Sequence, residues 1–172
     1  SGVRVYLDNV VYGESKFVAV GEVGAIISSP DGADWTTREY GGNSFYHGIA
    51  YGNSMFVVVG SLGATAYSPD GVTWTDGNTG TQTYLADVAY GEMKFVAVGR
   101  GGTVLTSDDG LDWTSRVSGA SGSLNCVTYG NGLFVAGSDN GETLVSSDGV
   151  SWQAGTVGTD LYIQDITYGN SM

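Results

Sequence analysis

The sequence predicts an all-β protein made of four-stranded antiparallel sheets, and three observations support this class. A pattern of 39 residues repeats without a shift along the 172-residue chain. Within each repeat, short segments rich in β-branched and aromatic residues alternate with turns rich in Gly, Asn, Asp and Ser. No segment shows the 3.6-residue periodicity of an amphipathic helix. Each repeat is therefore expected to form one sheet.

Three aromatic positions mark the repeat. Tyr-Gly pairs begin at Tyr12, Tyr51, Tyr90, Tyr129 and Tyr168; phenylalanine recurs at Phe17, Phe56, Phe95 and Phe134; and tryptophan recurs at Trp35, Trp74, Trp113 and Trp152. A constant period of this length is typical of repeat architectures. The chain is thus interpreted as one repeat domain, 1–172, with four complete repeats at 7–45, 46–84, 85–123 and 124–162 and the start of a fifth at 163–172.

The third repeat illustrates the strands that are expected in every copy. Residues 85–90 alternate in character and lead into a Gly-Glu-Met turn, which predicts the first strand. The apolar run 94–99 (KFVAVG) predicts a second strand that is covered on both faces. Residues 103–107 (TVLTS) and 112–116 (DWTSR) predict the third and fourth strands. The order predicts a four-stranded antiparallel meander.

A meander of 39 residues cannot bury two apolar faces alone, so neighbouring sheets must stack face to face. Radial stacking of such sheets is a β-propeller. A straight stack is the alternative, but sheet twist tends to fan successive sheets about an axis. We therefore expect four propeller blades and one extra inner strand, 163–168.

The turn between the third and fourth strands carries the most specific motif, Ser-x-Asp-Gly-x-x-Trp. Glycine after aspartate permits a left-handed residue, and the carboxylate can accept backbone N–H bonds within the loop. A hairpin staple is thus expected, although clustered oxygens could also hold calcium. The tryptophans are expected to pack on the turn, with sugar stacking as the alternative. The motif residues are Ser29, Asp31, Gly32, Trp35, Ser68, Asp70, Gly71, Trp74, Ser107, Asp109, Gly110, Trp113, Ser146, Asp148, Gly149 and Trp152.

This motif resembles the Asp-box of bacterial neuraminidase-type repeats. The longer frame around FVAVG is similar to blades of Asp-box propellers, which include photosystem II assembly factors and bacterial surface and phage proteins. The box here is one residue shorter than the usual Ser-x-Asp-x-Gly-x-Thr-Trp. The resemblance implies a structural box at the propeller rim, away from any active site, so its aspartates are not expected to be catalytic.

The loops that vary between repeats predict a ligand face. In a meander, the loops after the second and fourth strands share one side of the disc, and the uniform boxes lie on the other. Variation between copies marks positions that the fold does not dictate. Packing of the recurring aromatics between blades is the alternative interpretation. The candidate residues, suited to a glycan or a protein loop, are Tyr6, Asn43, Phe45, Gln82, Tyr84, Arg100, Asp139, Asn140 and Tyr162.

Catalysis, metal binding and cofactors are not expected. Arg38 and Arg116 share one position on the outer strand, where they cannot converge as the arginine cluster of a sialidase must, and four blades do not complete the six of such an enzyme. His47 has no carboxylate or nucleophile recurring beside it in sequence. Cys126 shares its position with Asn9 and Asp87 and is expected to be a buried small residue.

Composition limits the partners. The formal charge is -12, from 18 acidic and 6 basic residues, and such a field would repel nucleic acid and anionic membranes. No apolar run approaches the ~20 residues of a membrane span, and no signal peptide opens the chain. The acidic, lysine-poor composition favours an extracellular or cell-surface location, although one cysteine fits the cytoplasm equally.

Three functions remain open at this level. The first is a binding module for a glycan or protein; the second is a purely structural, self-assembling fragment, engineered or taken from a longer propeller. A remnant of a sialidase-like hydrolase is the third. Because an open row of blades would expose two apolar faces, we expect a homo-oligomer, with two chains forming eight blades and the surplus strand exchanged between them.

Overall fold

The computed structural model describes residues 5–38, 44–155 and 161–169, and it contains four antiparallel sheets of four strands each. The first sheet comprises β1 (Leu7–Gly13), β2 (Lys16–Gly21), β3 (Ile26–Ser29) and β4 (Thr36–Arg38). The second comprises β5 (Tyr46–Gly52), β6 (Met55–Gly60), β7 (Thr65–Ser68) and β8 (Thr75–Asp76). The third comprises β9 (Leu85–Gly91), β10 (Lys94–Gly99), β11 (Thr103–Ser107) and β12 (Thr114–Arg116). The fourth comprises β13 (Leu124–Gly130), β14 (Leu133–Ser138), β15 (Thr143–Ser146) and β16 (Gln153–Ala154).

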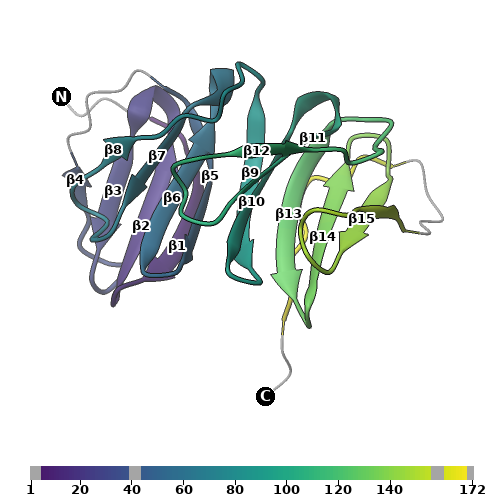
Figure 1. Ribbon diagram of the computed structural model, residues 1–172. Helices are drawn as coiled ribbons and strands as arrows, with labels where there is room; N and C mark the ends of the chain where they lie inside the picture. Colours follow the sequence, from purple (N-terminus) through teal and green to yellow (C-terminus); the bar gives the residue numbers. More distant parts are fainter. Residues whose placement is uncertain (1–4, 39–43, 156–160, 170–172) are drawn as a thin grey trace.

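The sheets stand side by side, like consecutive blades of a β-propeller (Figure 1). Each is a meander whose strands pair in sequence order. Helical structure within the described ranges is confined to three single 3₁₀ turns, η1 (Glu22–Gly24), η2 (Ser61–Gly63) and η3 (Arg100–Gly102), in the loops after the second strands. The predicted all-β propeller fold is confirmed. No helix of the described chain is long and apolar enough to cross a membrane.

Two strands differ from the prediction. The outer strand of the third sheet begins at Thr114 rather than at residue 112, because Trp113 still belongs to the turn and donates its indole N–H to the carbonyl of Gly110. Residues 163–169 run alongside the fourth sheet but form no strand ladder. A strand needs a paired neighbour, and no described strand forms a ladder with this segment.

The core lies between the sheets. The phenylalanine at the start of each second strand is fully buried in three blades, at Phe56, Phe95 and Phe134. One buried cluster joins Val96 and Val98 of β10 to Phe134 and Leu144 of the next sheet. Burial of each such side chain is worth about 1.5–3 kcal/mol. The central strands therefore read as continuous apolar runs because both of their faces are covered.

A Tyr-Gly contact repeats at every junction between blades. The ring of Tyr51 lies against Gly13 of the preceding blade, and Tyr129 lies against Gly91 in the same way. A Cβ placed on Gly91 would come within 2.2 Å of the Tyr129 ring, so only glycine fits there. The recurring Tyr-Gly pair is thus a contact between successive repeats as well as the end of a strand.

Candidate ligand-binding face

A bulge near the start of each inner strand aims one side chain away from the blade core. Register shifts between Leu7 and Asn9 and at the equivalent places of the other three sheets leave one extra residue in the inner strand. A bulge of this kind redirects the side chain that it carries. The extra residues are Asp8, His47, Ala86 and Asn125, and Gln164 holds the same repeat position in the fifth copy.

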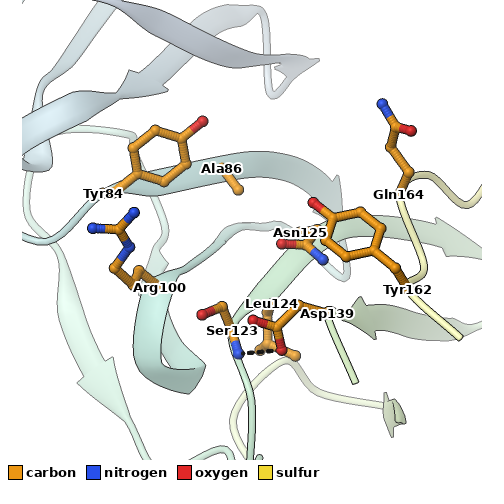
Figure 2. Close-up of a pocket in the computed structure, with 9 residues that line it drawn as sticks. All are labelled: Tyr84, Ala86, Arg100, Ser123, Leu124, Asn125, Asp139, Tyr162 and Gln164. Atoms are coloured by element: carbon orange, nitrogen blue, oxygen red, sulfur yellow. Dashed lines mark hydrogen bonds between the residues drawn. The ribbon is translucent and has the colours of Figure 1, made fainter. Parts of the chain in front are cut away.

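A pocket of about 450 Å³ lies on this face, between the third and fourth blades and residues 162–164 (Figure 2). Its walls combine two tyrosines, an arginine, a carboxylate and two amides. The lining residues are Tyr84, Ala86, Arg100, Ser123, Leu124, Asn125, Asp139, Tyr162 and Gln164. A few convergent polar groups beside aromatic rings are typical of ligand sites.

The first wall of the pocket is a stack of three side chains. The guanidinium Cζ of Arg100 lies 5.8 Å from the centre of the Tyr84 ring, which is cation–π range. The imidazole of His47 packs on the same tyrosine, with ring centres 4.5 Å apart. Tyr84 is 37% exposed, and its partial burial raises the pKa of its phenol. These contacts hold Tyr84 and Arg100 in place.

The opposite wall is held by hydrogen bonds. Asp139 accepts the backbone N–H of Ser123 at 3.0 Å (Figure 2) and returns its own backbone N–H to the Ser123 carbonyl at 2.9 Å. The amide of Asn125 donates to the carbonyl of Ile163 at 3.0 Å. This bond attaches the 161–169 segment to the fourth blade and so helps to position Tyr162 and Gln164.

His47 is not isolated, contrary to the expectation from sequence. Its Nδ1 lies 2.8 Å from Oδ2 of Asp8, and its Nε2 lies 3.0 Å from Oγ of Ser61. Both partners come from loops or bulges distant in sequence, which is why no local pattern indicated them. With Tyr84 packed on the ring, His47 joins the first blade to the second and supports the pocket wall.

Asp87, the residue after the bulge residue Ala86, links three blades through its side chain. Its Oδ1 accepts the backbone N–H of Val88 at 2.8 Å and lies 3.5 Å from the side-chain amide nitrogen of Asn9 in the first blade. Its Oδ2 accepts the backbone N–H of Val127 in the fourth blade at 2.9 Å. Burial, reinforced weakly by the charge of Asp165, raises the pKa of Asp87 from its ordinary value near 3.8 to about 7. Near neutral pH this carboxyl group is therefore only partly ionised.

The structure brings four of the nine predicted face residues into the pocket: Tyr84, Arg100, Asp139 and Tyr162. Tyr6 and Phe45 are exposed outside it, and so is Gln82. Asn140 bonds to Ser121 and Ser138 and supports its loop. Asn43 lies outside the described residues.

Sequence reasoning missed the bulge residues Ala86, Asn125 and Gln164, which line the pocket. A signal for them existed. The second residue of the inner strand differs in every copy, as Asp, His, Ala, Asn and Gln, and variation between copies was the criterion applied to the loops.

The four Ser-x-Asp-Gly turns have nearly the same hydrogen bonds. In the first, the Ser29 hydroxyl accepts the N–H of Gly32, and Asp31 accepts the N–H groups of Ala33 and Asp34. Backbone donors of this kind lower the pKa of all four aspartates, and for Asp148 to about 2. Among the described residues, no group of three or more His, Cys, Asp or Glu side chains is placed to hold a metal ion.

The tryptophans complete these turns in two ways. The indole N–H groups of Trp35, Trp113 and Trp152 donate to the carbonyl of the turn glycine. Trp74 differs: it is buried with its ring centre 6.5 Å from that of Phe56, and its N–H has no hydrogen-bond partner. Cys126 is buried, with its thiol toward the Gly137 carbonyl, and burial raises its pKa to about 12.

Comparison with known proteins adds support for the fold. No family model matches the sequence, and no curated protein matches it significantly. Among solved structures, the chain is similar to YCF48 bound to D1 peptide (TM-score 0.73, 15% identity, 95% of this chain and 57% of that one). It is also similar to YCF48 from Cyanidioschyzon merolae (TM-score 0.70, 18% identity, 95% of this chain and 60% of that one). A further similar structure is the nidogen/laminin complex (TM-score 0.75, 13% identity, 95% of this chain and 69% of that one).

These matches define the class of the protein as a β-propeller. The chain spans less than two thirds of the two YCF48 structures. Because the sequence identities are below about one fifth, these similarities show the fold alone, and function must be argued from the residues of the site.

Proposed function

We propose that the chain is a non-catalytic β-propeller module that binds a protein segment in the pocket between its third and fourth blades. The pocket carries the proposal because contacts within the protein hold Tyr84 and Arg100 in place. In addition, Arg100 and the bulge residues Ala86 and Asn125 differ from the residues at the equivalent positions of the other blades. A peptide offers side chains for the tyrosines and backbone groups for Asn125, Asp139 and Arg100. The known complex of a similar propeller with a peptide supports this class of ligand.

The Ser-x-Asp-Gly-x-x-Trp turns fit a structural role in this proposal, as they do in the Asp-box propellers that the sequence resembles. Their carboxylates are engaged by backbone N–H groups of their own turns. We propose that the chain is a divergent relative of that group. Its arginines do not support a sialidase site, because Arg38 and Arg116 bond to the neighbouring strand at Ser28 and Thr106.

The proposal is tested by selecting peptides from a displayed library on the immobilised 172-residue chain and measuring their dissociation constants. Tyr84→Ala and Arg100→Gln should each weaken binding by tenfold or more, which corresponds to about 1.4 kcal/mol. Arg38→Gln removes the same charge from an outer strand, and it should leave affinity unchanged.

A set of peptides that bind the pocket variants as well as the original chain would reject this site. Selection of no peptide, together with binding on a glycan array that Tyr84→Ala abolishes, would reassign the pocket to sugars. Absence of both activities would favour a purely structural role.

A further inference from the structure

The chain contains two Asn-Gly pairs, Asn131-Gly132 and Asn140-Gly141, and both lie in loops of the fourth blade. Such a pair can react within itself, because glycine has no side chain to hinder attack of its backbone nitrogen on the asparagine side chain. The reaction needs a side-chain amide and a backbone N–H that are free to approach each other. Both asparagines are exposed, so exposure alone does not distinguish the two pairs.

Asn131 and Gly132 form the turn between β13 and β14, and neither reacting group is engaged. Within the described ranges, the side-chain amide of Asn131 has no hydrogen-bond partner, and the backbone N–H of Gly132 has none either. No atom lies within 4 Å of the place that a Cβ on Gly132 would occupy. No contact with the rest of the protein therefore holds these two groups apart.

Asn140 is held by hydrogen bonds from both ends of its side-chain amide. Its Oδ1 accepts the hydroxyl of Ser138 at 2.5 Å and the backbone N–H of Glu142 at 3.2 Å. Its Nδ2 donates to Oγ of Ser121 at 2.7 Å. Gly141 is buried, and its N–H points to the Ser138 carbonyl at 3.4 Å. Both reacting groups of this pair must leave their partners before they can meet.

We propose that Asn131 is a site of spontaneous deamidation and that the fold protects Asn140 from the same reaction. The backbone nitrogen of Gly132 attacks Cγ of Asn131 and forms a C–N bond, its proton passes through water to Nδ2, and Nδ2 leaves as ammonia. A water molecule then opens the resulting cyclic imide. Opening at the Cγ carbonyl gives aspartate, and opening at the main-chain carbonyl gives isoaspartate, whose backbone continues through the former side chain.

The two products should affect the turn differently. The repeat position of Asn131 holds Glu14 in the first copy and Glu92 in the third, and each of these carboxylates accepts a hydrogen bond from a tyrosine hydroxyl of the next blade. A carboxylate is thus compatible with this turn. Isoaspartate lengthens the backbone of a short turn, and turn length sets the register of a hairpin. We therefore expect isoaspartate to destabilise the hairpin of β13 and β14.

The protected pair is the one beside the candidate ligand-binding pocket. Asn140 follows the pocket residue Asp139, whereas Asn131 lies at the opposite end of β13 from the pocket residues Leu124 and Asn125. Deamidation of Asn131 should therefore leave peptide binding by the pocket unchanged. Peptide binding is a separate measurement, so either proposal can fail without the other.

Mass spectrometry of proteolytic peptides tests the proposal on the 172-residue chain after incubation in mildly alkaline buffer. The peptide with Asn131 should acquire the mass change of an amide-to-acid conversion at least about tenfold faster than the peptide with Asn140, because several hydrogen bonds must open at Asn140 first. In the chain unfolded in guanidinium chloride, both pairs should react at similar rates. Asn131→Gln is the matched control, because its longer side chain forms a cyclic product far more slowly.

A second variant tests the protection of Asn140. Ser121→Ala removes the acceptor of its Nδ2, and it should speed deamidation of Asn140 severalfold while the rate at Asn131 stays the same. Equal rates at Asn131 and Asn140 in the folded chain would overturn the proposal. So would an unmodified Asn131 in the folded chain after the unfolded chain has reacted, or an unchanged rate at Asn140 in Ser121→Ala.

Discussion

At the scale of single residues, Asp87 is the position where packing changes chemistry most. It accepts backbone N–H bonds from Val88 and Val127, which favour the charged form, yet burial outweighs them and raises its pKa to about 7. The carboxyl group thus joins neighbouring blades, but its burial costs free energy, and this cost increases as the group ionises.

The stability of the protein should therefore depend on pH through this group. Between about pH 4 and pH 7 the folded chain binds more protons at Asp87 than the unfolded chain does, so the free energy of unfolding should fall as pH rises through this range. In Asp87→Asn this contribution disappears. The stability of the variant relative to the original chain should rise by a few kcal/mol between pH 4 and pH 8.

Urea unfolding at a series of pH values measures this difference. Asp108→Asn removes an exposed carboxylate from a turn and is the matched control, for which we expect no comparable rise. If the difference between Asp87→Asn and the original chain is the same at pH 4 and at pH 8, the assignment of the raised pKa to Asp87 is wrong.

His47 shows at the same scale why a lone residue in a sequence is hard to interpret. Asp8 precedes it by 39 residues and Ser61 follows it by 14, and both hydrogen-bond its ring. The carboxylate belongs to another blade, so the contact depends on how two repeats stack. No pattern within one repeat contains this information.

At the scale of the elements, the inner strand carries three functions in seven residues. Its second residue forms the bulge on the side of the candidate ligand-binding face, its alternating apolar residues fill the core, and its terminal Tyr-Gly pair joins neighbouring blades. The prediction of this strand from sequence was accurate in its bounds because β-branched alternation ends at a clear turn. The bulge was missed, since one extra residue does not alter the alternation visibly.

The Tyr-Gly contact predicts a large effect for a small substitution. In Gly91→Ala the new methyl group would lie 2.2 Å from the nearest ring carbon of Tyr129. Displacing the ring should lower the free energy of unfolding by roughly 1–3 kcal/mol. Thermal and urea unfolding of the variant measure the loss.

A double variant separates steric conflict from an intrinsic strand effect. Gly91→Ala combined with Tyr129→Ala should be more stable than the sum of the single effects predicts, because the methyl group then meets no ring. Additive effects would show that the contact with Tyr129 is not the cause.

At the scale of the whole molecule, the row of blades should not be uniformly stable. The second and third blades are covered on both faces, and the core side chains of β6 and β10 are fully buried, as at Val57 and Val96. The first blade has one open face. In repeat proteins, stability is approximately the sum of the repeats and their interfaces, so the end blades should open first.

Hydrogen exchange measures this gradient. At a concentration where the chain is monomeric, amides of β6 and β10 should exchange more slowly than the equivalent amides of β2. Equal protection of β2 and β6 in the monomer would contradict the view that interfaces between blades dominate stability.

The sequence by itself determined the features that are local to one repeat. These features are the 39-residue period, the meander of four strands and the hydrogen-bonded Ser-x-Asp-Gly turn. Each depends on residues a few positions apart, so the alternation of apolar residues and the turn residues predict it directly. One error of the prediction was also local. The start of β12 was predicted two residues too early, because Trp113 still belongs to the turn and donates to the Gly110 carbonyl.

Only the tertiary structure decided which variable residues meet. It selected Tyr84, Arg100, Asp139 and Tyr162 from the predicted face and joined them to the bulge residues in one pocket. It also brought Asn9 toward Asp87 across 78 residues. These contacts join different repeats, so they depend on the angle and spacing at which the blades stack, which the pattern within a single repeat does not specify.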